Sequence, residues 1–193
     1  MGEAMGPMFE GLAQASEALD AAPYHWVKME TNELPENALA AGKDQSEICN
    51  VFVGRAEVDG EPCVGKVHNN TRYYGSDMRE KRVTSLPFSV LCVDPSADIE
   101  WVEYKEGDLP TGIVIGGTST NGTHLYVGRG LVRNQLTPGM VFIDEEPYQL
   151  HALYDGNVNT MPAFEVLIIK HEAKEVIKES SEKQKEEAKV SHK

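Results

Sequence analysis

The sequence predicts a mainly β protein made of two intertwined copies of one antiparallel unit. The first observation is an internal duplication, because Val53-Gly54-Arg55 returns as Val127-Gly128-Arg129 after 74 positions. The second is a series of short runs rich in β-branched and aromatic residues, separated by turn dipeptides such as Asp59-Gly60. The third is that no central segment offers ten residues with helical periodicity. A period of this length is too long for a solenoid and suits a small domain built twice.

The duplication extends well beyond that tripeptide. Trp26 aligns with Trp101, the Leu-Pro pair at 34–35 with the pair at 109–110, and Gly42 with Gly117, all 75 positions apart. After the glycine the separation falls to 74, and it stays there for four further pairs: Arg55 with Arg129, Val58 with Val132, Gly65 with Gly139, and Val67 with Val141. These alignments predict a leader at 1–22, a first repeat at 23–96, a second repeat at 97–170 and a tail at 171–193.

The two flanks are predicted to lie outside the β body. In the leader, apolar residues recur at helical spacing over residues 8–21, which predicts either a short amphipathic helix or a segment with fluctuating helix. The tail from His171 to Lys193 holds six Lys and six Glu and almost no apolar residue after Ile177. Such a segment forms an exposed helix through spaced ion pairs or stays disordered, so we expect a solvated tail.

Each repeat is expected to contain a central hairpin and a buried closing strand. In the first repeat, Asp59-Gly60 separates runs at 56–58 and 63–67, which predicts a type I′ turn because both central residues of that turn need positive φ. Asn134 occupies the corresponding turn of the second repeat and tolerates the same conformation. The apolar runs at 88–93 and 164–169 are predicted to be the closing strands.

Charge and cysteine content exclude several classes of protein. The formal net charge is −13, and a nucleic-acid-binding protein needs a basic face instead. The three cysteines are an odd number without close spacing, so we expect no disulfide framework. No secretion signal is recognisable, and no apolar run reaches the ~18 residues of a membrane span. We therefore expect a cytoplasmic protein, with vesicle association or leaderless export as open alternatives.

The aligned motifs carry a resemblance to a known family. A unit that opens on Trp and continues with Leu-Pro, a Gly-rich bend, Val-Gly-Arg and a later Gly-Lys resembles the DM-nine repeat, and two such units cover roughly residues 26–169. Proteins with this layout include a mannose-binding lectin of molluscs and infection-responsive proteins of mosquitoes. The resemblance implies an antiparallel β body in which the repeats intertwine about a pseudo-two-fold axis. It also implies frequent homodimers and, in some members, sugar recognition with a role in innate immunity.

The resemblance implies site residues in the first repeat. A hexose presents vicinal hydroxyl groups, so its site needs a carboxylate acceptor and a cationic or amide donor. The mannose-binding relatives use an Asp of the Gly-rich bend and the Lys of the Gly-Lys pair, and the matching residues here are Asp44 and Lys66. Glu61, on the returning arm of the hairpin, is a candidate for a second carboxylate. In the second repeat Ser119 and Met140 replace the matched pair, so we expect one site per chain.

Each of these residues has a structural alternative. An Asp in a Gly-rich bend commonly binds its own backbone in an Asx-turn, and Lys66 could be an ordinary exposed strand lysine. Arg55 and Arg129 occur in both repeats, whereas the candidate site occurs in one, so we expect them to pair with carboxylates or carbonyls at the repeat interface. The two tryptophans could stack on a sugar, but as residues that open both units they are expected to be core anchors.

Two function classes remain open. The first is a lectin that binds mannose-containing glycans or microbial surfaces, in which each single site binds weakly and dimerisation supplies avidity. The second is a cytoplasmic, vesicle-associated interaction protein that binds no sugar. We expect no enzyme, no cofactor and no metal site, because the six histidines have no metal-ligand spacing and no catalytic motif is present. The expected partners include a second copy of the chain but neither nucleic acid nor an inserted membrane.

Overall fold

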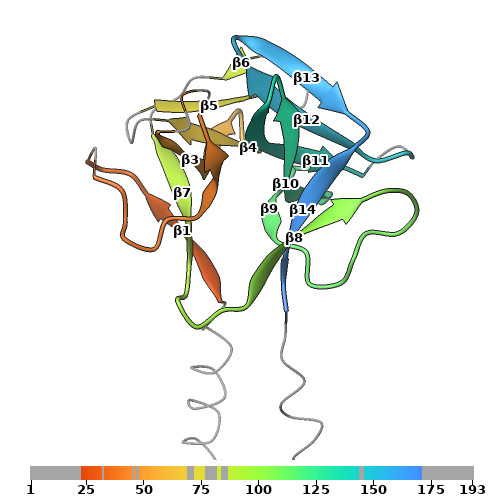
Figure 1. Ribbon diagram of the computed structural model, residues 1–193, viewed down its shortest axis with the longest axis horizontal. Coiled ribbons are helices and arrows are strands. Elements are labelled where there is room, and N and C mark those ends of the chain that lie inside the picture. Colours follow the sequence, from red (N-terminus) through yellow and green to blue (C-terminus); the bar gives the residue numbers. More distant parts are fainter. Residues whose placement is uncertain are drawn as a thin grey trace, which may run out of the picture.

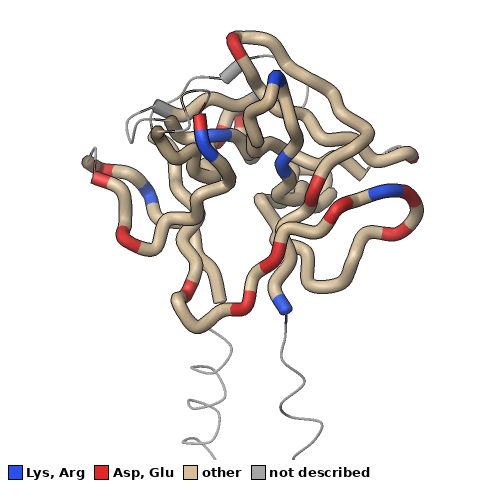
Figure 2. The backbone as a smooth tube through the Cα atoms, viewed as in Figure 1, with Lys and Arg blue, Asp and Glu red and all other residues tan. Residues whose placement is uncertain are grey.

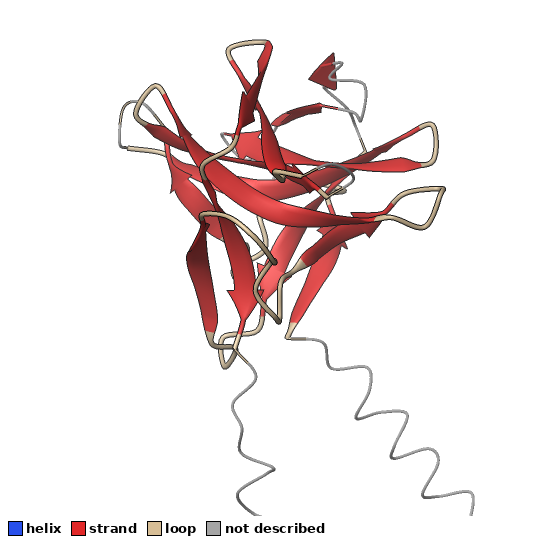
Figure 3. Cartoon of the chain, turned by 90° about the vertical axis from the view of Figure 1, so that its right-hand side faces the viewer, coloured by secondary structure: helices blue, strands red, loops and turns tan. Residues whose placement is uncertain are grey.

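The computed structural model describes residues 23–31, 33–44, 46, 48–68, 72–76, 82–83, 87–143 and 146–170. The predicted leader helix and the charged tail lie outside these residues. Within the described part of the chain every regular element is a strand and no helix occurs, as Figure 3 shows. The prediction of a mainly β protein is confirmed.

In the described residues, fourteen strands form two seven-stranded sheets in which every pairing is antiparallel. The first sheet has the order β1-β7-β3-β4-β5-β6, with β2 pairing β3. Its strands are β1 (Tyr24–Lys28), β2 (Ala40–Lys43), β3 (Asn50–Val58), β4 (Glu61–His68), β5 (Arg72–Ser76), β6 (Arg82–Val83) and β7 (Phe88–Val93).

The second sheet has the order β13-β12-β11-β10-β14-β8, with β9 pairing β10. Its strands are β8 (Ile99–Tyr104), β9 (Ile115–Thr118), β10 (His124–Val132), β11 (Gln135–Phe142), β12 (Gln149–Tyr154), β13 (Asn157–Met161) and β14 (Phe164–Ile169). Figure 1 shows the two sheets side by side, the first in orange to yellow-green and the second in green to blue. The predicted repeat boundary at 96/97 falls in the connection between β7 and β8.

The central hairpins form as the turn residues predict. Asp59 and Gly60 have φ of 55° and 81°, and Val58 pairs with Glu61 across the turn. In the second repeat Arg133 and Asn134 have φ of 45° and 68°, and Val132 pairs with Gln135. The closing strands β7 and β14 pair with β3 and β10, and both lie in the buried interior, as expected.

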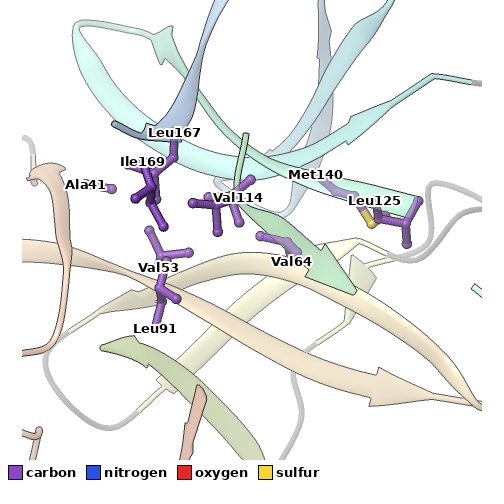
Figure 4. Close-up of a cluster of buried hydrophobic side chains, with 10 residues drawn as sticks. Ala41, Val53, Val64, Leu91, Val114, Leu125, Met140, Leu167 and Ile169 are labelled. Atoms are coloured by element: carbon purple, nitrogen blue, oxygen red, sulfur yellow. The ribbon is translucent and has the colours of Figure 1, made fainter. Parts of the chain in front are cut away.

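The main hydrophobic core belongs to both repeats. Figure 4 shows its side chains approaching one another from the two sheets. The first repeat contributes Ala41, Val53, Val64 and Leu91, and the second contributes Val114, Leu125, Val127, Met140, Leu167 and Ile169. Burying one side chain of the size of Val or Leu stabilises the folded state by about 1.5–3 kcal/mol. The two repeats therefore stabilise each other across this shared core.

Two arginines connect the repeats reciprocally. Nη1 of Arg55 donates to the carbonyl oxygen of Gly116 at 2.9 Å, and Nη1 of Arg129 donates to that of Ala41 at 2.7 Å. The Arg55 guanidinium lies 4.5 Å from the ring centroid of Trp26, and the Arg129 guanidinium lies 4.4 Å from that of Trp101. The structural role expected for both arginines is confirmed.

The tryptophans are anchors rather than exposed platforms. Trp26 and Trp101 are half-buried, and both pack against the shared core. The exchange of contacts between the repeats is what a pseudo-two-fold arrangement would produce, and the axis itself stays a prediction.

The aligned glycines of the two bends lie where each repeat touches the other. A Cβ atom on Gly42 would lie 2.7 Å from Cβ of Leu136, and one on Gly117 would collide with the ring of Pro62. Glycine therefore allows β2 to approach β11 and β9 to approach β4. The bend that carries Asp44 is held against the second repeat by this close approach.

Candidate functional site

A cleft of about 740 Å³ opens where β4 and β5 of the first sheet meet β11 and β12 of the second. These four strands lie in the upper half of Figure 1. Its size lies in the range of small-ligand sites. The first repeat lines it with Asp44, Ser46, Lys66, His68 and Tyr74, and the second lines it with Arg133, Gln135, Leu153, Tyr154, Asp155 and Gly156. The sequence placed the site in the first repeat alone. In the structure, the cleft that Asp44 and Lys66 line is also lined by residues of the second repeat.

Asp44 is held in place by its own loop. One carboxylate oxygen, Oδ1, accepts hydrogen bonds from the Ser46 hydroxyl at 2.6 Å, the Ser46 amide at 3.1 Å and the Cys49 amide at 3.3 Å. This is the Asx-turn that the structural alternative predicted. The hydrogen bond from the Ser46 hydroxyl is the largest effect and lowers the pKa of Asp44. Burial, the second largest effect, raises this pKa, and the Cys49 amide and His68 lower it further.

The second oxygen of Asp44 has a different environment. Oδ2 lies 3.5 Å from Nε2 of His68, and among the described residues it has no closer polar partner. The loop therefore fixes the carboxylate through Oδ1 and leaves Oδ2 with capacity to accept a further hydrogen bond.

Lys66 reaches the same cleft from β4. Its side chain is half-buried, and Nζ lies 4.9 Å from the ring centroid of Tyr154 in the second repeat. Burial lowers the pKa of Lys66, and the nearby charge of Asp155 opposes that shift. In the described part of the chain no carboxylate lies within 4 Å of the ammonium group. Lys66 is thus not an ordinary exposed lysine but a partly desolvated cation with donor capacity left over.

Glu61, the tentative second carboxylate, is not among the residues that line the cleft. Its carboxylate accepts a hydrogen bond from the Thr120 amide at 3.2 Å and another from the Thr120 hydroxyl. Glu61 lies at the start of β4, whereas Lys66 lies near its end. The structure therefore brings Asp44 and Lys66 together and leaves Glu61 elsewhere.

Comparison with models of known protein families identifies the family of the chain. The model of the DM9 repeat matches twice, at residues 6–84 and 73–149, and these matches cover well over half of the chain. The chain belongs to the DM9 repeat family. No individual curated protein matches it. The family resemblance read from the Trp, Leu-Pro and Val-Gly-Arg motifs is confirmed, and the likeness to particular mollusc or mosquito proteins stays a prediction.

The two DM9 repeats differ at the positions of the matched pair. Ser119, which aligns with Asp44, is buried, and its hydroxyl bonds to the Asn121 side chain and to the carbonyl oxygen of Thr123. Met140, which aligns with Lys66, is fully buried in the shared core. The second repeat uses these positions for packing and for its own loop, so it cannot offer the same pair of charges.

Several lining residues were missed from the sequence. Leu153, Tyr154 and Asp155 reach the cleft from the end of β12 and the turn that joins it to β13. That turn contains Asp155-Gly156 with φ of 49° and 77°, the same dipeptide and conformation as in the first DM9 repeat. An Asp-Gly pair between strand-forming runs is a hairpin signal, so this element was readable from the sequence.

Metal and membrane features complete the description. Among the described residues, no group of three or more His, Cys, Asp or Glu side chains could hold a metal ion. The part of the chain that the structure describes has no helix with the length and apolar character needed to cross a membrane.

Proposed function

We propose that this DM9 repeat protein is a carbohydrate-binding protein of the mannose type, with one site per chain in the cleft between its repeats. The observation that carries the proposal is that Asp44 and Lys66, 22 positions apart in the sequence, line the same cleft. They are also the two positions that match the site of the mannose-binding relatives. The general association of the family with carbohydrate binding and immunity also supports the proposed carbohydrate-binding function.

The chemistry of the cleft suits vicinal hydroxyl groups. Oδ2 of Asp44 can accept a hydrogen bond from one hydroxyl group, and the Lys66 ammonium can donate to the oxygen of its neighbour. Gln135, on the opposite side of the cleft, supplies an amide that both donates and accepts. The charges are held before the ligand arrives, because the Asx-turn fixes Asp44 and the Tyr154 ring supports Lys66. Such preorganisation reduces the entropic cost of binding.

The Tyr154 ring does not itself act as a stacking platform in this proposal. Tyr154 is only 7% exposed, and its face is occupied by the ammonium of Lys66. A cation placed over an aromatic face is attracted by the ring quadrupole. The ring therefore positions the donor, and recognition depends on polar contacts. A site of this kind binds a monosaccharide weakly, with a dissociation constant of about 0.1–1 mM or above.

Weak single sites become effective when they are linked. We therefore propose a homodimer that engages glycan arrays or microbial surfaces with avidity, in a pattern-recognition role. The mass of the native protein from light scattering tests this part, and a monomer at all concentrations up to about 1 mM would contradict it. No enzymatic role is proposed.

Retention on mannose-agarose tests the sugar site directly. We expect the native chain to be retained and eluted by free mannose, and Asp44→Asn and Lys66→Met to pass through. Glu61→Gln is the matched control, because it neutralises a carboxylate of the same repeat outside the cleft, and it should be retained. If the native chain passes through, or if both cleft variants are retained, the lectin proposal fails and the interaction protein without sugar binding becomes the better reading.

A further inference from the structure

The two interface arginines differ in one contact. Nε of Arg129 donates to Oε2 of Glu165 at 2.6 Å, and Glu165 stands opposite Arg129 in the β10–β14 pairing. In the first repeat, the residue opposite Arg55 in the β3–β7 pairing is Ser89. Both guanidinium groups otherwise make the same contacts, with a Trp ring and a carbonyl oxygen of the other repeat. Among the described residues of the first repeat, Arg55 therefore has no counterpart of the Glu165 carboxylate beside it.

Arg55 and Ser89, the counterparts of Arg129 and Glu165, both line a pocket. A pocket of about 350 Å³ is lined by Arg55, Ser89, Lys28, Glu57, Phe88 and Thr118, and small residues and prolines complete the lining. Within the described ranges of the chain, no carboxylate oxygen lies within 4 Å of a nitrogen of Arg55. Burial lowers the pKa of Arg55, and Glu57, the acidic group of this pocket, opposes that shift together with Tyr24. The lining of the pocket thus includes two cationic side chains and one exposed carboxylate.

We propose that this pocket binds the carboxylate group of a small organic acid, in the position that Glu165 takes against Arg129. A guanidinium presents a planar fork of donors that matches a carboxylate, and a partly buried one gains more from such a partner than an exposed one. Lys28 adds a second positive charge and Ser89 a hydroxyl donor. None of these residues lines the Asp44–Lys66 cleft, so the carboxylate site is independent of the proposed mannose site.

The test is a titration of the full chain followed by NMR, with D-glucuronate as the probe and D-glucose as its neutral counterpart. We expect glucuronate to shift the Nε–H signal of Arg55 and the amide signal of Ser89 at millimolar concentration. The Nε–H signal of Arg129 should not respond, because Glu165 already occupies it. Glucose should shift neither signal.

Four variants sharpen the test. Ser89→Glu, which copies the second repeat, should weaken glucuronate binding at least tenfold without lowering the unfolding temperature. Lys28→Ala should weaken it at least threefold, and Glu57→Gln should strengthen it, because one removes an attractive and the other a repulsive charge. Lys28 and Glu57 are exposed, so these two changes keep the test valid if Ser89→Glu does not fold. Lys66→Met should bind glucuronate as the native chain does.

Several outcomes would overturn the proposal. One is an equal response to glucose and glucuronate, and another is unchanged binding in both Lys28→Ala and Glu57→Gln. Tighter binding of inorganic phosphate than of glucuronate would reject the carboxylate class. Loss of glucuronate binding in Lys66→Met would place the ligand in the mannose cleft instead.

Discussion

Substituting Lys66 by Met tests the proposed cleft with a residue that the protein itself uses at the equivalent place, because Met140 aligns with Lys66. Methionine keeps a long, unbranched side chain of similar volume and removes the ammonium group. The contact with the Tyr154 ring is retained as an apolar contact, so the change is directed at the charge.

The magnitude follows from the two roles of the ammonium. A hydrogen bond from a charged donor contributes about 1.5–3 kcal/mol, which corresponds to roughly a 10- to 150-fold change in affinity. For stability, losing the cation–π contact costs about 0.5–1 kcal/mol, and removing a partly desolvated charge offsets that loss. We therefore expect the dissociation constant for mannose to rise at least tenfold, while the unfolding temperature changes by less than about 4 °C.

The assay pairs an NMR titration with methyl mannoside and a thermal unfolding curve for each protein. Lys105→Met is the matched control, because Lys105 is a 79% exposed lysine whose nearest carboxylate, Glu103, lies at 3.4 Å on the surface. The control should bind as the native chain does. The reasoning is refuted if Lys66→Met binds mannose with unchanged affinity. It is equally refuted if affinity and unfolding temperature fall together, because Lys66 would then be a structural residue.

Three further predictions address charge and backbone. Glu165→Gln should lower the free energy of unfolding by about 1–3 kcal/mol in a denaturant titration, because Arg129 loses a partly buried partner, whereas Ser89→Gln should change it little. The affinity for mannose should fall at an alkaline pH below pH 10.5, because burial lowers the pKa of Lys66 and the neutral amine is a poorer donor. Asp155→Asn should move this loss of affinity to a still lower pH, because the charge of Asp155 stabilises the ammonium form of Lys66. Gly60→Ala should destabilise the protein by about 1 kcal/mol in the same titration, because Gly60 has a φ of 81°.

The repeat alignment and the turn dipeptides predicted the core of each sheet. Both central hairpins and both closing strands lie where the sequence placed them. These elements are predictable because their signals are local: strand-forming runs, and turn residues that accept positive φ. The hairpin at Asp155-Gly156 carried the same signal and was readable in principle.

Other elements were harder to predict for a physical reason. In β8 the apolar residues do not alternate strictly, because Ile99 and Trp101 pack on the shared core while Val102 and Tyr104 pack in a second cluster. The set of residues that line the cleft also depends on contacts between the repeats, and sequence patterns within single strands do not predict such contacts. Glu61 shows this clearly: it aligns with Gln135, which lines the cleft, yet its own carboxylate binds Thr120 on the opposite repeat.

The two roles considered for Asp44, a structural Asx-turn and a binding carboxylate, are compatible in the structure. A residue in an Asx-turn is usually regarded as structural, but a carboxylate has two oxygens, and here the turn uses Oδ1. The turn lowers the pKa of the group and restricts its rotation, and both effects favour recognition of a neutral ligand by Oδ2. A local structural role is therefore no argument against a binding role.

The differences between the repeats follow one pattern. At two aligned positions the second repeat completes its contacts internally: Met140 is buried in the core, and Glu165 neutralises Arg129. At the same positions the first repeat has Lys66, whose ammonium is partly desolvated, and Ser89, which leaves Arg55 without a carboxylate within 4 Å in the described chain. A partly buried cation with no carboxylate within about 4 Å retains part of its desolvation cost, and the second repeat shows that this scaffold accepts the alternative residues. Under the two binding proposals, these charges of the first repeat serve ligands rather than the stability of the fold.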